Sequence, residues 1–396
     1  MSKILLCVTG GVAAYKVVEL ASLMRKRGDD VRILMTKSAI RFVSPLTFSA
    51  VGNFPVYTDA FDVNDGTILH TNLSSWGDIL IVAPMTANTA AKIANGMADN
   101  LVTMTTLAFT GPKIGVPSMN VRMYENPITA ENLSKLSKSG WHIVEPESGH
   151  LADGERGKGR YPDNEKILFE IDTVLEPNDF KGLNVLVSAG PTIEPIDPVR
   201  YITNRSSGKM GYEIARAAKM RGANVALISG PVNLPVPYGV DGEFVQTADE
   251  MKNAILRRLS WSNIVIMAAA VADYKPSKAL SQKLKKHANE INLHMVKNVD
   301  ILEEISKIRR DDQFIVGFAA ETENLMENSR HKMKSKKLDM IVANDVSHSD
   351  IGFGSDYNEV TIFCKDDNVI RIGRNKKSYV AHNILDIIKS HRVKLT

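Results

Sequence analysis

Glycine and hydroxyl residues follow three apolar runs of the sequence, at positions that favour phosphate binding. Gly10-Gly11, Thr36 and Thr86 each come at or just after the end of such a run. If the runs are parallel strands, these residues lie beyond the carboxyl ends, where open α/β sheets bind ligands. Backbone N–H groups at the start of a following helix can hold a phosphate there. The turn lacks the full Gly-x-Gly-x-x-Gly spacing, so taken alone a structural tight turn explains it equally well.

Lysine spacing near residue 330 could serve a polyphosphate. Lys332 and Lys336 are four residues apart, which places both on one face of a helix. A triphosphate would require such a pair, although a solvated lysine face is the simpler explanation of the spacing alone. The sequence contains no Gly-x-x-x-x-Gly-Lys-Ser/Thr motif, so it is not a P-loop protein.

Alternating strands and helices are predicted to position these residues, and the alternation occurs twice. Each half ends a helix and opens a strand in the same way, at Arg27–Val31 and at Arg221–Val225. The rhythm predicts an α/β protein with two doubly wound, Rossmann-like or flavodoxin-like domains in tandem. The boundary is expected near Leu175–Leu183, which is polar and turn-rich. The predicted strands are Ile4–Val8, Val31–Met35, Ile79–Ala83, Ile114–Val116, Asn184–Ser188, Val225–Ile228 and Ile264–Ala268.

Composition indicates an ordinary soluble globular protein of 396 residues, with 44% hydrophobic and 24% charged residues. The net charge of +4 suits a protein that handles phosphorylated anions and is too small to indicate nucleic acid. We expect no membrane span and no secretory signal. Cys7 and Cys364 both lie in apolar runs, so we expect two buried core cysteines and a reducing, cytoplasmic location.

His70 and Asn120 lie in motifs that together resemble the flavin-dependent cysteine decarboxylases. The motifs are His70-Thr71-Asn72-Leu73 and Pro117-Ser118-Met119-Asn120-Val121-Arg122. Alone, the histidine would be a cap or surface residue and the asparagine a loop amide. The resemblance implies FMN bound by Gly10, Gly11, Thr36 and Thr86, with His70 as the base that assists thiol oxidation. It implies that Asn120 binds the carboxylate that leaves as carbon dioxide, and the oxidised sulfur supplies the electron sink that this departure needs.

One residue departs from the decarboxylase pattern. The family loop carries a cysteine that acts as the final acid, whereas this sequence reads Gly149-His150-Leu151-Ala152-Asp153-Gly154-Glu155. Asp153 stands at the cysteine position. We expect Asp153, or its neighbours Glu155 or His150, to be the acid, with a carboxyl pKa raised by burial under the closed loop. The alternative is that reduction fails and an enethiol is released.

The second half resembles the CTP-dependent phosphopantothenate–cysteine ligases. The motifs that carry this resemblance are Ser188–Thr192, Asp197–Gly211, Ala268–Tyr274, Val296–Ile301, Gly317–Thr322 and Ala343–Val346. The resemblance implies that Lys283 stabilises the charge of phosphoryl transfer and that Asn204 contacts the acyl-cytidylate. It implies nucleotide binding by Ala269, Asp273, Lys283, Asn298, Asp300, Phe318, Lys332 and Lys336, with Mg²⁺ accompanying CTP.

The two resemblances together indicate the bifunctional family that makes 4'-phosphopantetheine for coenzyme A. Residues 1–178 are expected to form the FMN-dependent phosphopantothenoylcysteine decarboxylase and residues 181–396 the CTP-dependent ligase. The small-molecule substrates are 4'-phosphopantothenate, cysteine and CTP. The resemblance further implies dimeric ligase domains, trimeric decarboxylase domains and a homo-oligomer, expected to be a dodecamer. Two alternatives stay open: a first domain that stops at the enethiol, or one that is only a flavin-binding oligomerisation scaffold.

Overall fold

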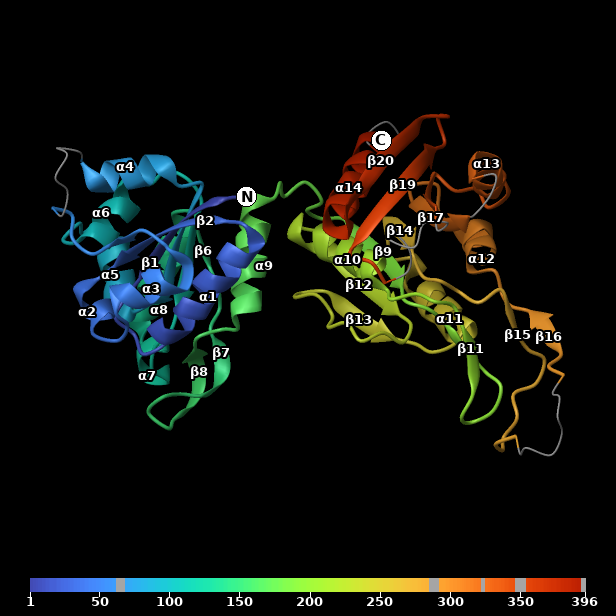
Figure 1. The fold of residues 1–396 in the computed structure, drawn as a ribbon, viewed down its shortest axis with the longest axis horizontal. Helices are drawn as coiled ribbons and strands as arrows, with labels where there is room; N and C mark the ends of the chain where they lie inside the picture. The colour runs from blue at the N-terminus through green and yellow to red at the C-terminus, as the bar shows by residue number, and fades with distance from the viewer. Residues whose placement is uncertain (62–67, 285–291, 322–324, 346–353, 393–396) are drawn as a thin grey trace. The chain divides into compact units, whose positions relative to one another are not determined.

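The chain forms two compact units, Met1–Pro177 and Asn178–Thr396 (Figure 1). The computed structural model describes residues 1–61, 68–284, 292–321, 325–345 and 354–392. Thr322 and Val346, the last residues of two motifs of the second half, lie outside these ranges. None of the helices within these ranges is both long and apolar enough to cross a membrane.

The first unit is built on a six-stranded parallel sheet with the strand order β3-β2-β1-β4-β5-β6. The order reverses between β1 and β4, which is the point where doubly wound sheets bind ligands. Its strands are β1 Lys3–Val8, β2 Asp30–Met35, β3 Val56–Tyr57, β4 Ile79–Met85, β5 Lys113–Pro117 and β6 Trp141–Ile143. A separate antiparallel hairpin consists of β7 Glu147–His150 and β8 Arg156–Arg160.

Helices cover both faces of this sheet. Every side chain of β1 after Lys3 is therefore buried, whichever face it points to. Ile4, Leu6 and Val8 belong to one core cluster and Leu5 and Cys7 to the other. Burying each such aliphatic side chain contributes roughly 1.5–3 kcal/mol. The helices are α1 Ala14–Arg27, α2 Lys37–Ile40, α3 Pro45–Gly52, α4 Leu69–Trp76, α5 Ala87–Ala94, α6 Leu101–Ala108, α7 Val121–Tyr124, α8 Pro127–Lys138 and α9 Asn164–Leu175.

The second unit has an eight-stranded sheet with the order β13-β12-β9-β14-β17-β18-β19-β20. The strands are parallel from β13 to β18, and β19 and β20 extend the sheet in antiparallel fashion. They are β9 Asn184–Ala189, β12 Asn224–Ser229, β13 Asp241–Phe244, β14 Ile264–Met267, β17 Phe314–Glu321, β18 Met340–Asp345, β19 Tyr357–Cys364 and β20 Val369–Lys376. Two short antiparallel pairs complete the strands, β10 Ile193–Pro195 with β11 Tyr201–Thr203 and β15 Tyr274–Pro276 with β16 Met295–Lys297.

Two core clusters again lie on opposite faces of the second sheet. Helices α10 and α14 supply one of them and α11, α12 and α13 the other. These helices are α10 Lys209–Met220, α11 Ala248–Leu259, α12 Ile301–Ile308, α13 Leu325–Ser335 and α14 Lys377–Arg392. The predicted α/β class and parallel sheets are therefore confirmed, and each predicted strand lies within two residues of its observed bounds. The prediction that both cysteines are core residues is also confirmed, since Cys7 and Cys364 are buried.

Candidate active sites

The larger cavity lies in the first unit, beyond the carboxyl ends of β1 and β4, and has a volume of about 1230 Å³. Thr9 joins these two strand ends. Its hydroxyl donates to the Pro84 carbonyl at 2.5 Å and accepts from the Thr86 backbone N–H at 3.3 Å. The cavity therefore forms at the switch point of the sheet, where ligands are expected.

Helix N-termini supply the phosphate-binding character of this cavity. Gly10 and Gly11 line it just before α1, and Thr86 caps α5 by accepting from the Thr89 backbone N–H at 3.2 Å. A Cβ at Gly10 would lie 2.3 Å from the Cβ of Ser38, so only glycine fits that turn. Thr36 lines the cavity as well and accepts from the Ala39 N–H at 3.2 Å. Together these backbone groups can hold an anion such as a cofactor phosphate.

Asn120 presents its amide nitrogen to carboxylates. Its Oδ1 accepts from the Arg122 backbone N–H at 2.8 Å, which leaves Nδ2 to donate. Nδ2 donates to Asp153 and, at 3.0 Å, to Oε2 of Glu155, which also pairs with the Arg122 guanidinium. Both carboxylates belong to the loop of the β7–β8 hairpin. The amide is thus a carboxylate-binding group, and in this conformation carboxylates of the protein itself accept its hydrogen bonds.

The expected rise in the pKa of Asp153 does not occur in this conformation. Asp153 is exposed rather than buried, and the hydrogen bonds from the Asn120 amide and then the Glu155 backbone N–H lower its pKa. The carboxylate is consequently ionised at neutral pH, and burial cannot raise its pKa while the loop lies here. Cys7 is no substitute acid, since burial raises the pKa of its thiol far above the ordinary value.

His70 does not line the cavity, and among the residues predicted for the first unit only Glu155 shares this. His70 is half-buried near the start of α4. Other lining residues were not assigned from the sequence: Lys16, Lys37, Lys92, Asp99, Arg160 and Tyr161. For two of them the sequence carries a signal, a basic side chain at a strand end or in the hairpin: Lys37 follows Thr36, and Arg160 ends β8.

The smaller cavity, of about 150 Å³, lies in the second unit beside the ends of β14 and β17. Seven of the predicted nucleotide residues line it: Ala269, Asp273, Asn298, Asp300, Phe318, Lys332 and Lys336. Asp273 does not end a strand. Strand β14 stops at Met267, and Asp273 lies directly before β15. The short pair β15–β16 then returns the chain to Asn298, whose backbone N–H donates to the Asp273 carbonyl at 2.7 Å.

Asn298 carries a buried donor that lacks a partner. Its Oδ1 accepts from the Val299 N–H at 3.0 Å, whereas its Nδ2 bonds to no described residue. Buried polar groups are almost always hydrogen-bonded, so an isolated donor at a cavity points to a ligand acceptor. A pyrimidine ring offers such acceptors on its edge.

Lys336 and Asp300 form an ion pair at 2.5 Å on the wall of the same cavity. Burial acts to raise the pKa of Asp300, but Lys336 and the Glu303 N–H outweigh it, so the pKa is lowered overall. Lys332 lies one helical turn before Lys336, and the Lys336 N–H donates to the Lys332 carbonyl at 3.1 Å. Both ammonium groups therefore line one wall, as a polyphosphate site requires.

Asn204 and Lys283 do not line this cavity. The Asn204 amide donates to the carbonyls of Ala270 and Val271, at 3.3 and 3.1 Å, and so contacts the segment after β14, in which Val271 lines the cavity. Lys283 is exposed. Its segment is held by Asp197, which accepts from the Leu284 N–H at 3.1 Å and was not assigned from the sequence.

Family comparisons agree with the two-unit architecture. A family described as "Flavoprotein" matches residues 1–176, and "DNA/pantothenate metabolism flavoprotein C-terminal domain" matches residues 180–391. The coenzyme A biosynthesis bifunctional protein CoaBC of Bacillus subtilis is 46% identical over 97% of this chain and 96% of its own length. That of Escherichia coli K12 is 44% identical over 98% and 96%. The chain belongs to the CoaBC family.

Solved structures match each unit separately. The C-terminal domain of a CoaBC protein covers 54% of this chain and 97% of its own, with 39% identity and a TM-score of 0.47. A PPC decarboxylase mutant complexed with pantothenoylaminoethenethiol covers 43% and 96%, with 32% identity and a TM-score of 0.40. Membership of the CoaBC family confirms the prediction of a bifunctional enzyme of coenzyme A biosynthesis, with a flavoprotein unit followed by a ligase unit.

Proposed function

We propose that this chain makes 4'-phosphopantetheine in two steps. The second unit joins cysteine to 4'-phosphopantothenate with CTP, and the first unit then decarboxylates the 4'-phosphopantothenoylcysteine with FMN. The observation that carries the proposal is the Asn120 amide, which donates to two carboxylates at the edge of a cavity large enough for a flavin. A group that binds carboxylates beside a cofactor cavity suits a decarboxylase.

In the first unit, FMN when bound supplies the two-electron oxidation and reduction that cysteine decarboxylation needs. The N-termini of α1 and α5, with Gly10, Gly11, Thr36 and Thr86, hold its phosphate. Asn120 binds the departing carboxylate through Nδ2. His70 accepts the thiol proton at a cavity that another copy of the chain completes, because His70 does not line the cavity of its own chain.

The final proton goes to carbon from the β7–β8 hairpin. Asp153 and Glu155 both reach Asn120, and His150 lines the same cavity. When substrate takes the Asn120 amide, Asp153 loses the hydrogen bond that lowers its pKa most. Its pKa then rises toward the range in which a carboxyl can donate a proton.

In the second unit, the carboxylate of 4'-phosphopantothenate attacks the α-phosphorus of CTP, which forms an acyl-cytidylate and releases pyrophosphate. Lys332, Lys336 and Lys283 offset the negative charge of that step, and Asn298 and Phe318 hold the cytidine. Asn204 contacts the acyl-cytidylate, and cysteine's amine then displaces CMP. Mg²⁺ accompanies CTP. We further propose dimeric ligase units and trimeric decarboxylase units in a homo-oligomer, a dodecamer.

The test is mass spectrometry of the products from purified chain, FMN, 4'-phosphopantothenate, cysteine, CTP and Mg²⁺. We expect 4'-phosphopantetheine. A decarboxylated product lacking two hydrogens would favour the enethiol alternative, and 4'-phosphopantothenoylcysteine alone would favour the scaffold alternative. No product at all would refute the proposal.

The same assay assigns the acid. Asp153→Asn should release the product that lacks two hydrogens, because an amide at this position cannot donate the proton that a carboxyl donates. Glu155→Gln is the matched comparison from the same loop and should still give 4'-phosphopantetheine. The reverse pattern would transfer the role to Glu155.

A further inference from the structure

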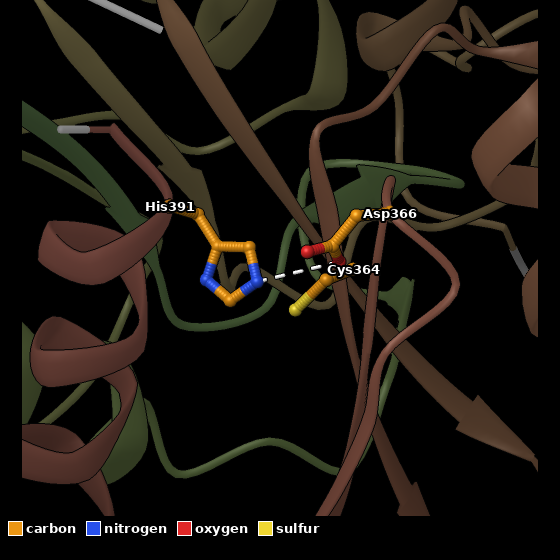
Figure 2. Close-up of side chains that lie close together, drawn as sticks. All are labelled: Cys364, Asp366 and His391. Carbon is orange, nitrogen blue, oxygen red and sulfur yellow. Dashed lines mark ion pairs between the residues drawn. The ribbon is translucent and has the colours of Figure 1, made fainter. Parts of the chain in front are cut away.

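Three side chains with metal-binding atoms meet near the C-terminal end of the second unit (Figure 2). Cys364 ends β19, Asp366 lies in the turn before β20, and His391 lies in the last turn of α14. The sulfur, carboxylate and imidazole ligand atoms all lie within 4.8 Å of one another. Thiolate, imidazole and carboxylate are the donors that zinc uses in proteins.

The spacing between His391 and Asp366 fits a shared cation. Nε2 of His391 lies 3.3 Å from Oδ1 of Asp366, yet this buried nitrogen makes no hydrogen bond to any residue that the structure describes. Two ligands about 2.0–2.1 Å from a tetrahedral zinc are themselves about 3.3–3.4 Å apart. A cation bound by both atoms lies off the line that joins them. Nε2 of His391 and Oδ1 of Asp366 can therefore lie 3.3 Å apart without the alignment that a hydrogen bond requires.

Neighbouring groups orient both ligands. Nδ1 of His391 lies 2.9 Å from the Ile387 carbonyl, which can only accept, so Nδ1 carries the proton. A ring bound to a cation through Nε2 is neutral, and this tautomer leaves the lone pair of Nε2 for that cation. Asp366 accepts from Asn368 twice, from Nδ2 at 2.8 Å through Oδ2 and from the backbone N–H at 3.4 Å through Oδ1, and these bonds orient the carboxylate. Outer hydrogen bonds of this kind are typical of metal-binding histidines and carboxylates.

We propose that Cys364, Asp366 and His391 bind a thiophilic divalent cation, with zinc as the best match. Binding displaces the thiol proton of Cys364, so one thiolate and one carboxylate balance the charge of the ion. A water molecule completes the tetrahedron. The ion would fasten the β19–β20 turn to the end of α14. The competing explanation is an imidazolium–carboxylate ion pair beside a core cysteine, without any metal.

The experiment measures zinc bound by the untagged full-length chain after dialysis, in the absence of nucleotide and substrate. It is therefore independent of the proposed function. We expect about one zinc per chain and, with cobalt in its place, the near-ultraviolet absorption of a cobalt–thiolate bond. Cys364→Ser should abolish that absorption and the bound zinc. Cys7→Ala, which removes the buried cysteine of the other unit, should change neither.

Two milder variants keep the test decisive if Cys364→Ser does not fold. Asp366→Asn and Asn368→Ala alter an exposed turn, and the second removes only an outer partner of the cation. Zinc affinity should fall about 10- to 100-fold in Asn368→Ala and further in Asp366→Asn. A folded wild-type chain that binds no zinc, or equal binding in the wild type and Asp366→Asn, would overturn the proposal in favour of the ion pair.

Discussion

Asn120 illustrates how one hydrogen bond gives an amide a chemical preference. The Arg122 N–H occupies Oδ1 at 2.8 Å, so only Nδ2 faces outward and the side chain favours acceptors such as carboxylates. In the same way, the Val299 N–H occupies Oδ1 of Asn298 and leaves its Nδ2 as a donor. The two candidate sites therefore share one feature. In each, a backbone N–H donates to Oδ1 of an asparagine, and the amide nitrogen is left to bond to the ligand.

Asn120→Asp should reduce decarboxylation of 4'-phosphopantothenoylcysteine at least about 100-fold, because a carboxylate replaces the donor and repels the substrate carboxylate. The rate of carbon dioxide release measures this effect. Asn126→Asp is the matched control, since Asn126 also caps a helix of this unit through its side-chain oxygen and aspartate caps equally well. Ligation should be unaffected in both variants. An unchanged rate in Asn120→Asp would remove Asn120 from the proposed site.

Asn298→Ala should raise the KM for CTP about 10- to 100-fold, because the ligand loses a buried hydrogen bond worth roughly 1–3 kcal/mol. Steady-state ligation kinetics over a range of CTP concentrations measure the change. Thermal unfolding supplies the control. Since Nδ2 has no partner among the described residues, only the Val299 contact is removed and the loss of stability should be small. A KM for CTP equal to that of the wild type would contradict the nucleotide assignment.

At the scale of elements, the turn between β1 and α1 depends on a close approach to α2. A Cβ at Gly10 would meet Ser38 at 2.3 Å, whereas a Cβ at Gly11 would lie 3.4 Å from its nearest neighbour, in ordinary contact. Gly10→Ala should therefore displace α1 or α2 and cost about 1–3 kcal/mol. It should also lower the amount of flavin that copurifies. Gly11→Ala should retain most of the flavin, and equal flavin loss in both variants would argue against this packing explanation.

Several of these elements could be predicted from the sequence because their patterns are local. Buried parallel strands such as β1 and β4 are continuous apolar runs, and the turns after them carry glycine or threonine. The β7–β8 hairpin is glycine-rich and lacks apolar alternation, so its sequence does not indicate strands. A repeated strand–helix rhythm also predicts only parallel strands, and β19 and β20 break that rule. The contact of Asp153 with Asn120 depends on tertiary packing across 33 residues, which no local pattern reveals.

At the scale of the whole molecule, an ion-pair cluster around a buried arginine ties the start of the second unit to its last helix. Arg221, which directly follows α10, is 2% exposed and bonds to Asp179 at 2.6 Å and to Asp386 of α14 at 2.7 Å. Burial opposes ionisation of Asp179, but Arg221 and Lys389 prevail and lower its pKa to about 2. A fragment that begins at residue 181, the expected ligase boundary, would lack Asp179.

Asp179→Asn should lower the free energy of unfolding of the second unit by about 2–3 kcal/mol at neutral pH, because a buried guanidinium loses a charged partner. Urea denaturation measures this loss. The folded pKa is depressed, so this stabilisation is complete above the ordinary value of 3.8 and disappears as pH falls toward about 2. The difference between the wild type and the variant should shrink over that range. A difference that does not depend on pH would show that the ion pair is not its source.

The occupied amide of Asn120 has a consequence for turnover. A substrate with a carboxylate must exchange places with the side chains of the β7–β8 hairpin, so part of its binding energy is used to release that loop. A product that has lost its carboxylate no longer offers that acceptor to the Asn120 amide. Asp153 and Glu155 of the hairpin can then bond to the amide again. The enzyme would thereby distinguish its substrate from its product by the carboxylate alone, and 4'-phosphopantetheine would compete weakly with new substrate for the site.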